Sequence, residues 1–356
     1  MGNNNKTRQR LIAHYKKYPE MQIQDLFKYL YQSSFGCEHM LTSADKVTEV
    51  ICAEREEKRS LLSADELVEE LDGGYSRVSL SCLEKGLNPE TLGHIFCASA
   101  KKEPSGKETL EEKILVLRKL ICDKVIDISL YEFEQAFDRW RESGYQSLSH
   151  SDIFRSCYNP SYRVIANEYV RLLPLLTKID SLLQNGSVII AIEGGSASGK
   201  TTLGALLCDI YDANIFHMDD FFLRLEQRTP ERYSKIGENI DWERFSQEVL
   251  IPLSRGEEVN YRRFNCYTMM LEKAKKITPK RISIVEGVYS MHKELATYYD
   301  LSVFLDIDPD LQRKRITKRN TPDVAKRFYE EWIPLENIYF EFFGVKEQCD
   351  ITISCD

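Results

Sequence analysis

The pattern of hydrophobic and polar positions divides the chain into two parts. In the first part, apolar residues recur every three or four positions between charged ones, as at Leu26, Phe27, Leu30 and Tyr31. This period predicts amphipathic helices. Six such stretches cover residues 11–36, 43–59, 63–74, 105–126, 129–152 and 159–187. Residues 1–183 are therefore predicted to form a mostly α-helical domain, in which "YNPSYRVI" (158–165) marks a turn into the last helix, with Pro160 at its first positions.

After Gln184–Ser187 the pattern changes to short apolar runs rich in β-branched residues, separated by amphipathic stretches. The runs cover residues 188–193, 214–218, 282–287, 301–307 and 350–354. Runs of this kind predict a buried parallel sheet with helices on both faces. Residues 187–356 are thus predicted to form a second domain, of the α/β class.

Composition narrows the classes of partner. The chain has 356 residues and a formal net charge of -8, with 42% hydrophobic and 29% charged residues. An acidic balance argues against nucleic acid and anionic membranes as partners, although a local basic patch lies at Arg313–Arg319. No run of 18 apolar residues occurs, and the N-terminus lacks the apolar core of a signal peptide. The ten cysteines include no C-x-x-C pair, so we expect reduced thiols in a cytoplasmic protein.

One stretch carries specific chemistry. Residues 194–201 fit G-x-x-x-x-G-K-[ST], after a predicted strand and at the start of a predicted helix. In this context the backbone N–H groups bind phosphate oxygens at the helix N-terminus, Lys200 reaches the β- and γ-phosphates, and Thr201 binds Mg²⁺. The predicted nucleotide-binding residues are Gly194, Gly195, Ser196, Ala197, Ser198, Gly199, Lys200, Thr201 and Thr202.

Acidic residues follow two of the other predicted strands. Asp219 and Asp220 come directly after residues 214–218, and Glu286 lies at the end of run 282–287. Ligands of parallel sheets bind outside the carboxyl ends of the strands. There Asp219 can take the proton of an acceptor hydroxyl or help to hold Mg²⁺, and Glu286 can hold its water shell. Alternatively, the side chains of Asp219 and Asp220 only cap the loop that follows the strand.

The sequence lacks the motifs that are typical of other classes of nucleotide-binding protein. "TKID" (177–180) precedes the phosphate loop instead of following it, so it is not the base-reading element of a GTPase, and the "LSGGQ" element of transport ATPases does not occur. Small-molecule kinases remain.

Residues of about 186–356 resemble the uridine kinase and phosphoribulokinase group of P-loop kinases. The resemblance rests on "GGSASGKT", "MDDFF", "NIDWERF", "VEGVYS" and "DIDPDLQRKRITKR". It implies that Asp219 is the catalytic aspartate and that Asp241 holds the acceptor's hydroxyls. It also implies that Arg315 and Arg319 are lid arginines that stabilise the transferred phosphoryl group, although a basic helix of this kind is commonly a solvated face.

The acceptor region departs from this group. "VNYRRFNCYTMML" (259–271) offers the aromatic residues Tyr261, Phe264 and Tyr267. Asn265 stands where an aspartate is expected, and no histidine follows. The neighbouring Arg262 and Arg263 suit an acidic acceptor such as glycerate or a sugar phosphate, or they are exposed arginines at an edge.

Three hypotheses follow. The first is an ATP- or GTP-dependent, Mg²⁺-dependent kinase that phosphorylates a small-molecule hydroxyl, with uridine or a similar nucleoside as the leading acceptor. The second is a kinase for a non-nucleoside hydroxy compound such as glycerate or a sugar derivative. The third is a nucleotide-binding switch with a helical partner-binding module. The oligomeric state stays open, and a homo-oligomer is possible.

The predicted site residues fall into three groups. The predicted catalytic residues are Asp219, Lys200, Arg315 and Arg319. The predicted substrate-binding residues are Asp220, Asp241, Tyr261 and Phe264, and the predicted metal ligands are Thr201, Asp219 and Glu286.

The helical part carries two stretches dense in Gly, His, Cys, Ser and Tyr, a composition typical of recognition loops. They are "QSSFGCEHML" (32–41) and "SLSHSDIFRSCYNPSYRVI" (147–165). Cys37, His39 and His150 can be considered as metal ligands, but a lone histidine near a helix end is more often a packed or capping residue. The role of this part is left open.

Overall fold

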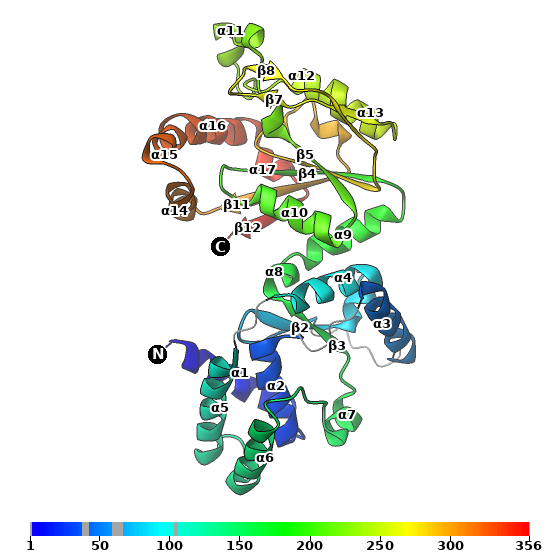
Figure 1. Cartoon of the computed structure of the whole chain (residues 1–356), viewed down its shortest axis with the longest axis vertical. Coiled ribbons are helices and arrows are strands. Elements are labelled where there is room, and N and C mark those ends of the chain that lie inside the picture. The colour runs from blue at the N-terminus through cyan, green and yellow to red at the C-terminus, as the bar shows by residue number, and fades with distance from the viewer. Residues whose placement is uncertain (1, 38–42, 59–66, 103–105, 356) are drawn as a thin grey trace. The chain divides into compact units, whose positions relative to one another are not determined.

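The computed structural model describes residues 2–37, 43–58, 67–102 and 106–355. Contacts divide the chain into two compact units, Met1–Asp180 and Ser181–Asp356, which are described separately (Figure 1). Of the sequence-based predictions, His39 and the first residues of the helix expected over 63–74 lie outside the described residues. Within the described ranges, no helix is long and apolar enough to cross a membrane.

The first unit is mostly helical, as predicted. Its helices are α1 (Gly2–Lys17), α2 (Ile23–Phe35), α3 (Ala44–Lys58), α4 (Pro89–Ala100), α5 (Gly106–Cys122), α6 (Leu130–Glu142), α7 (Asp152–Tyr158), α8 (Asn167–Val170) and α9 (Leu173–Leu183). The start of α6 follows local chemistry, because the Ser129 side chain accepts a hydrogen bond from the backbone N–H of Glu132.

The first unit also contains a sheet that the sequence analysis did not predict. Strands β1 (Val68–Glu70), β2 (Tyr75–Ser79) and β3 (Tyr162–Ala166) form an antiparallel sheet in that order. The helix expected over 63–74 is therefore wrong for the described residues from 67 on, and the turn expected at 158–165 leads into β3 rather than into a helix. The pairing of β2 with β3 joins segments far apart in sequence, so tertiary contacts override the helical pattern here.

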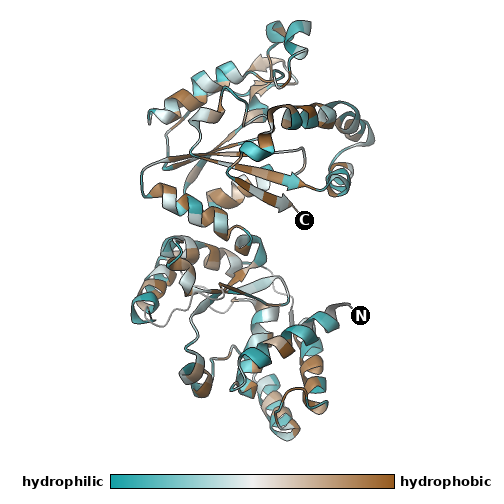
Figure 2. Ribbon diagram, turned by 180° about the vertical axis from the view of Figure 1, so that it is seen from behind, coloured by the Kyte–Doolittle hydropathy of each residue, from teal (hydrophilic) through white to brown (hydrophobic). Residues whose placement is uncertain are grey.

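The second unit is the predicted α/β domain. Its sheet is entirely parallel, in the order β12-β11-β4-β10-β5, and all five predicted runs are strands. The strands are β4 (Val188–Gly194), β5 (Ala213–His217), β10 (Ile282–Glu286), β11 (Leu301–Ile307) and β12 (Ile351–Cys355). Figure 2 shows these strands among the hydrophobic parts of the ribbon. Every residue of β4, the central strand, is buried.

Helices cover both faces of this sheet. Ile190, Ile284 and Ile215 share one row across three strands, and that face meets α10 (Lys200–Ile210). The neighbouring residues Ile189 and Val285 belong to a second cluster on the opposite face, together with side chains of the C-terminal helices. Those helices are α16 (Ile333–Phe343) and α17 (Val345–Gln348), which follow α14 (Pro309–Arg319) and α15 (Pro322–Arg327) along the chain.

The segment between β5 and β10 is built from short elements. It contains α11 (Pro230–Tyr233), α12 (Trp242–Phe245) and α13 (Ile251–Ser254), with two small antiparallel ladders. The ladders pair β6 (Val259–Tyr261) with β9 (Lys275–Ile277), and β7 (Phe264–Asn265) with β8 (Met270–Leu271).

Candidate active site

The phosphate loop connects β4 to α10, in the place predicted for it. Gly194 and Gly199 have φ angles of +141° and +108°, which residues with a Cβ rarely adopt. A Cβ at Gly194 would lie 2.6 Å from the carbonyl oxygen of Leu305 on β11. Glycine at this position therefore lets the loop begin while β4 and β11 stay paired.

Two side chains of the loop indicate an anionic ligand. Lys200 is buried, and its Nζ donates to the carbonyl oxygens of Gly194 and Gly195 at 2.8 and 2.9 Å. The buried Oγ of Ser198 has no hydrogen-bond partner among the described residues. A phosphate oxygen would supply that partner and would draw the ammonium group off the carbonyls, so the loop fits a nucleotide phosphate.

Thr201 and Glu286 lie together at the carboxyl ends of the central strands. The Thr201 hydroxyl donates to Glu286 Oε2 at 3.2 Å, and the other carboxylate oxygen pairs with His217 Nδ1 at 2.5 Å. This hydrogen bond raises the pKa of His217 above its usual value. The predicted ligands Thr201 and Glu286 are thus brought together, whereas sequence reasoning missed His217, which directly precedes Met218 and Asp219 at the end of β5.

Asp219 begins the turn after β5 and is accessible to solvent. The protein that surrounds its carboxyl group removes water and raises its pKa, and the charges of Glu286 and Asp220 act in the same direction, against Lys200. A raised pKa suits a group that takes up a proton during a reaction. The charge of Lys200 thus acts on the carboxyl group of Asp219.

The oxygen donors fit Mg²⁺. Hydroxyl and carboxylate oxygens are the protein ligands that this ion prefers, and it commonly keeps several waters and binds substrate phosphates. Across the residues that the structure describes, no group of three or more His, Cys, Asp or Glu side chains forms a closed metal cage. Thr201, with Glu286 beside it, is therefore a partial set of ligands that nucleotide phosphates would complete.

The C-terminal helices hold the loop from the other side. Gln312 Nε2 donates to the Ser196 carbonyl at 2.8 Å, and Arg315 Nη1 donates to the carbonyls of Ala197 and Ser198, both at 3.2 Å. Arg319, the second predicted lid arginine, is exposed and lies over the Phe328 ring at 5.6 Å from its centroid. The structure brings Arg315 to the loop, and within its described ranges it shows no hydrogen bond or ion pair between Arg319 and the loop.

Two buried carboxylates that sequence reasoning missed also hold the loop. Glu336 of α16 accepts from the backbone N–H of Ser196 at 2.8 Å and from its hydroxyl at 2.5 Å, and burial raises its pKa. Glu193 accepts from the N–H groups of Gly194 and Met291 at 2.9 and 3.0 Å. Burial raises the pKa of Glu193 to about 8. No local motif marks Glu336, since it comes to the loop from 140 positions away along the chain.

Two of the predicted acceptor residues, Asp220 and Tyr261, are hydrogen-bonded to each other. Asp220 accepts a hydrogen bond from the Tyr261 hydroxyl at 2.6 Å and pairs with Arg263 Nε at 2.9 Å. Tyr261 is buried, and its oxygen also accepts from the backbone N–H of His217 at 3.1 Å. Both carboxylate oxygens of Asp220 are thus engaged with protein groups, and Tyr261 fixes the end of β5 beside Asp219.

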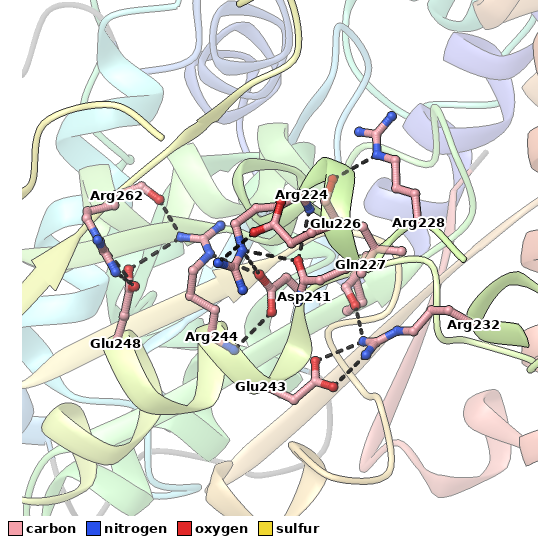
Figure 3. Close-up of polar contacts among 12 residues, drawn as sticks. Arg224, Glu226, Gln227, Arg228, Arg232, Asp241, Glu243, Arg244, Glu248 and Arg262 are labelled. Atoms are coloured by element: carbon pink, nitrogen blue, oxygen red, sulfur yellow. Dashed lines mark hydrogen bonds and ion pairs between the residues drawn. The ribbon is translucent and has the colours of Figure 1, made fainter. Parts of the chain in front are cut away.

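Asp241 lies in an arginine-rich part of the same region (Figure 3). It is 1% exposed, caps α12 through the N–H of Arg244, and pairs with Arg224 and Arg244 at 3.3 and 3.4 Å. Arg262, offered above as a contact for an acidic acceptor, pairs instead with Glu248. In this structure Asp241 therefore orders the fold beside the site, and its contact with an acceptor stays a prediction.

Arg228 differs from its neighbours in Figure 3. Its Nε donates to the carbonyl of Leu223 at 2.9 Å, its guanidinium lies 5.7 Å from the centre of the buried Phe264 ring, and no ion pair joins it to a carboxylate of the described chain. Phe264 and Arg228 thus offer an apolar face and a cation next to each other. Tyr267, by contrast, is fully exposed.

A scan against protein families agrees with this geometry. Residues 189–331 match the family described as "Phosphoribulokinase / Uridine kinase family". The match includes the phosphate loop, Asp219, Glu286 and Arg315.

Curated relatives match the same region at low identity. The chain is 29% identical to a uridine kinase of Geobacillus kaustophilus over 150 residues, which cover 39% of this chain and 69% of that protein. It is 29% identical to uridine-cytidine kinase A of Dictyostelium discoideum over 151 residues, which cover 39% of this chain and 29% of that protein. The matched region thus spans less than a third of the Dictyostelium protein.

Two solved structures show similarity to about half of the chain. One is a possible uridine kinase from Bacillus stearothermophilus, with 21% identity, a TM-score of 0.38, and 51% of this chain and 99% of that chain covered. The other is a putative fructose transport system kinase from Silicibacter, with 22% identity, a TM-score of 0.41, and 50% and 94% covered. The family match and the loop geometry together support a kinase of the P-loop type in the second unit, whose residues 189–331 match the phosphoribulokinase/uridine kinase family.

Proposed function

We propose that the second unit transfers the γ-phosphoryl group of ATP or GTP, bound with Mg²⁺, to a hydroxyl group of a small molecule, with uridine or a similar nucleoside as the first candidate. The observation that carries this proposal is that Asp219 lies in the turn after β5, where the charges of Lys200 and Glu286 act on its carboxyl group. The names of the curated relatives support the choice of uridine.

In the proposed reaction, the Asp219 carboxylate accepts the proton of the acceptor hydroxyl. The hydroxyl oxygen then forms a bond to the γ-phosphorus as the bond between that phosphorus and the β–γ bridging oxygen breaks, which releases ADP or GDP. Lys200 and the loop N–H groups hold the phosphates in line, and Mg²⁺ neutralises charge on them. We propose that Arg315 leaves the loop carbonyls to bind the transferred group, with Arg319 entering as the lid closes.

A non-nucleoside acid is the second candidate acceptor. Arg228 supports it, because its guanidinium lies over the Phe264 ring and has no carboxylate partner among the described residues. Its charge, like those of Asp219 and Asp220, acts on the pKa of the Cys266 thiol. A carboxylate or phosphate on the acceptor would pair with this guanidinium. A nucleoside would instead place its base against Phe264.

One experiment separates these acceptors and tests the catalytic base. The purified chain is incubated with Mg-ATP or Mg-GTP and single acceptors from a panel of nucleosides, glycerate and sugar alcohols, and the phosphorylated product is identified by mass spectrometry. We expect Asp219→Asn to lower the rate of transfer by about 10²- to 10⁴-fold while nucleotide affinity is kept. Asp209→Asn, at an exposed position on α10, is the matched control.

Two outcomes would contradict the proposal. If no acceptor is phosphorylated faster than ATP or GTP is hydrolysed, the nucleotide-binding switch becomes the better explanation. If Asp219→Asn transfers as fast as Asp209→Asn, Asp219 is not the base.

A further inference from the structure

The first unit contains a cleft of about 580 Å³, a volume typical of sites for small molecules. The cleft lies where α2 and the end of α3 meet the segment after α6, and much of its wall comes from the loop sequence 147–160 that the composition singled out. Its polar and charged walls include Lys28, Lys58, Ser149, His150, Arg155 and Asn159.

Positive charge is concentrated in this cleft. Lys28 is half-buried, and its Nζ donates to the carbonyl of Leu148 at 2.7 Å. Burial, together with the charges of Arg77 and Arg155, lowers the pKa of Lys28 to about 8. Two cations thus act on Lys28, and one of them, the Arg155 guanidinium at the wall of the cleft, forms no ion pair with the described residues. An anion placed between them would relieve this repulsion.

The acidic residues nearby do not neutralise these cations fully. Glu54 is paired with Arg163 at 2.9 Å, accepts a hydrogen bond from Ser161, and meets Lys58 at 3.4 Å. Glu57 is exposed at the rim. Asp25 is fully buried, and its carboxylate accepts hydrogen bonds from the N–H and hydroxyl of Ser151. The carboxylates of Glu54 and Asp25 are therefore committed to groups of the protein.

The floor of the cleft is held in one arrangement. The two ring nitrogens of His150 pair with Asp25 Oδ1 at 2.9 Å and with the Tyr162 hydroxyl at 2.6 Å, and the ring stacks on Phe154 with 4.2 Å between centroids. Burial lowers the pKa of His150 to about 4, so the ring is neutral at pH 7. A wall fixed in advance reduces the conformational entropy that a ligand must remove on binding.

We infer that this cleft binds a small molecule through an oxyanion group, a phosphate or a carboxylate, which Lys28 and Arg155 hold from two sides. Lysine and arginine are the side chains that form charge-assisted hydrogen bonds with such groups. The hydroxyl and amide groups of Ser149 and Asn159 face the remainder of the ligand. The site belongs to the first unit alone, so it is separate from the phosphate loop.

Labelled inorganic phosphate is the probe. Binding to the full chain is measured by equilibrium dialysis in excess unlabelled Mg-ADP, which keeps phosphate off the loop of the second unit. We expect one saturable phosphate site per chain, weakened at least tenfold by Arg155→Ala and by Lys28→Met. Arg139→Ala, at an exposed arginine of α6, is the matched control and is expected to leave affinity unchanged.

Competition and folding measurements make each outcome decisive. Displacement of the phosphate by citrate at equal concentration assigns the cleft to carboxylates, and resistance to citrate assigns it to phosphate esters. Circular dichroism and thermal unfolding are used to check that both variants are folded, and because Arg155 is exposed, its loss should remove little packing. Absence of a saturable site, or a site that survives both substitutions in folded chains, overturns the inference.

Discussion

The two units organise their buried polar groups in different ways. In the second unit, the groups around the phosphate loop follow one another closely in sequence, from Glu193 to Thr201, and the backbone itself supplies many of the contacts. In the first unit, a buried network joins side chains from distant segments through Arg77. Its guanidinium donates to Gln32 at 2.9 Å, pairs with Glu69 at 3.3 Å, and lies over the rings of Tyr29 and Tyr162.

This difference has a physical meaning. A site built from backbone conformation needs residues that permit a particular chain path, so glycines at fixed spacing carry the information. A site built from side chains needs partners of matching charge at any separation along the chain. The first kind leaves a mark in a single sequence, and the second kind does not.

Breaking the network at its centre is expected to give the largest effect. Arg77→Met removes the buried cation that pairs with the partly exposed Glu69 and donates to the buried side-chain carbonyl of Gln32, so the free energy of unfolding of the first unit should fall by about 3 kcal/mol. Hydrogen exchange followed by mass spectrometry reports each unit separately: peptides of β2 and β3 should lose protection, and those of β4 and β11 should keep it.

Arg8→Met, at an exposed arginine of α1, is the control for that change. Equal loss of protection in both units would show that their stabilities are coupled. No loss in the first unit would show that the network around Arg77 is not what stabilises it.

A smaller effect is expected at the phosphate loop, which Glu336 contacts from a helix far away along the chain. Glu336→Gln keeps the shape of the side chain but removes the charge that strengthens its bonds to the N–H and hydroxyl of Ser196. We expect the free energy of unfolding of the second unit to fall by about 1 kcal/mol, measured by denaturant unfolding. Glu341→Gln, exposed on the same helix, is the control. A fall above about 3 kcal/mol would mean that the shape of the loop depends on α16 rather than on its own sequence.

Gradual changes of stability with pH are also expected, with opposite signs in the two units. In the first unit, His150 has a pKa of about 4 when folded and its ordinary value of 6.5 when unfolded, so the unfolded chain binds more protons between these values. The stability of the first unit should therefore be complete above pH 6.5 and fall as the pH drops toward 4. The pKa of buried His14 is lowered in the same direction.

In the second unit, Glu193 has a folded pKa of about 8 against an ordinary value of 4.5. Its contribution is fully present below pH 4.5 and is lost as the pH rises from there through 8, because over that range the folded state still holds a proton that the unfolded state has already lost. Hydrogen exchange between pH 5 and 8, corrected for intrinsic rates, should show slopes of opposite sign, on the order of 1 kcal/mol per pH unit at most. Slopes of equal sign in the two units would contradict these assignments, and Glu193→Gln should flatten the slope of the second unit.

These networks also explain how far the sequence could be interpreted. All five strands of the parallel sheet were predictable, because a strand buried on both faces is a continuous apolar run between turns. The strand Tyr162–Ala166 was not, because it is short, lies among helices, and depends on pairing with Tyr75–Ser79. Pro160, just before this strand, is as compatible with the start of a helix as with a turn into a strand.

The same distinction holds within the candidate site. Lys200, Thr201, Asp219 and Glu286 stand at strand ends or in a motif, and the structure brings them together. Glu336 and Gln312 contact the loop from helices whose sequence shows only amphipathic character, so no pattern marks them. The pairing of Asp220 with Tyr261 and Arg263 likewise depends on contacts more than 40 positions apart.

The position of β4 at the centre of the sheet has a consequence for synthesis of the chain. Its neighbours on either side, β10 and β11, are made much later, at Ile282–Glu286 and Leu301–Ile307. When the ribosome has just completed "VIIAIEG", the emerging strand is apolar except for Glu193 and has no partner until most of the second unit has been translated. During that interval this strand is a natural client for molecular chaperones, and slow translation through residues 195–281 would prolong its exposure.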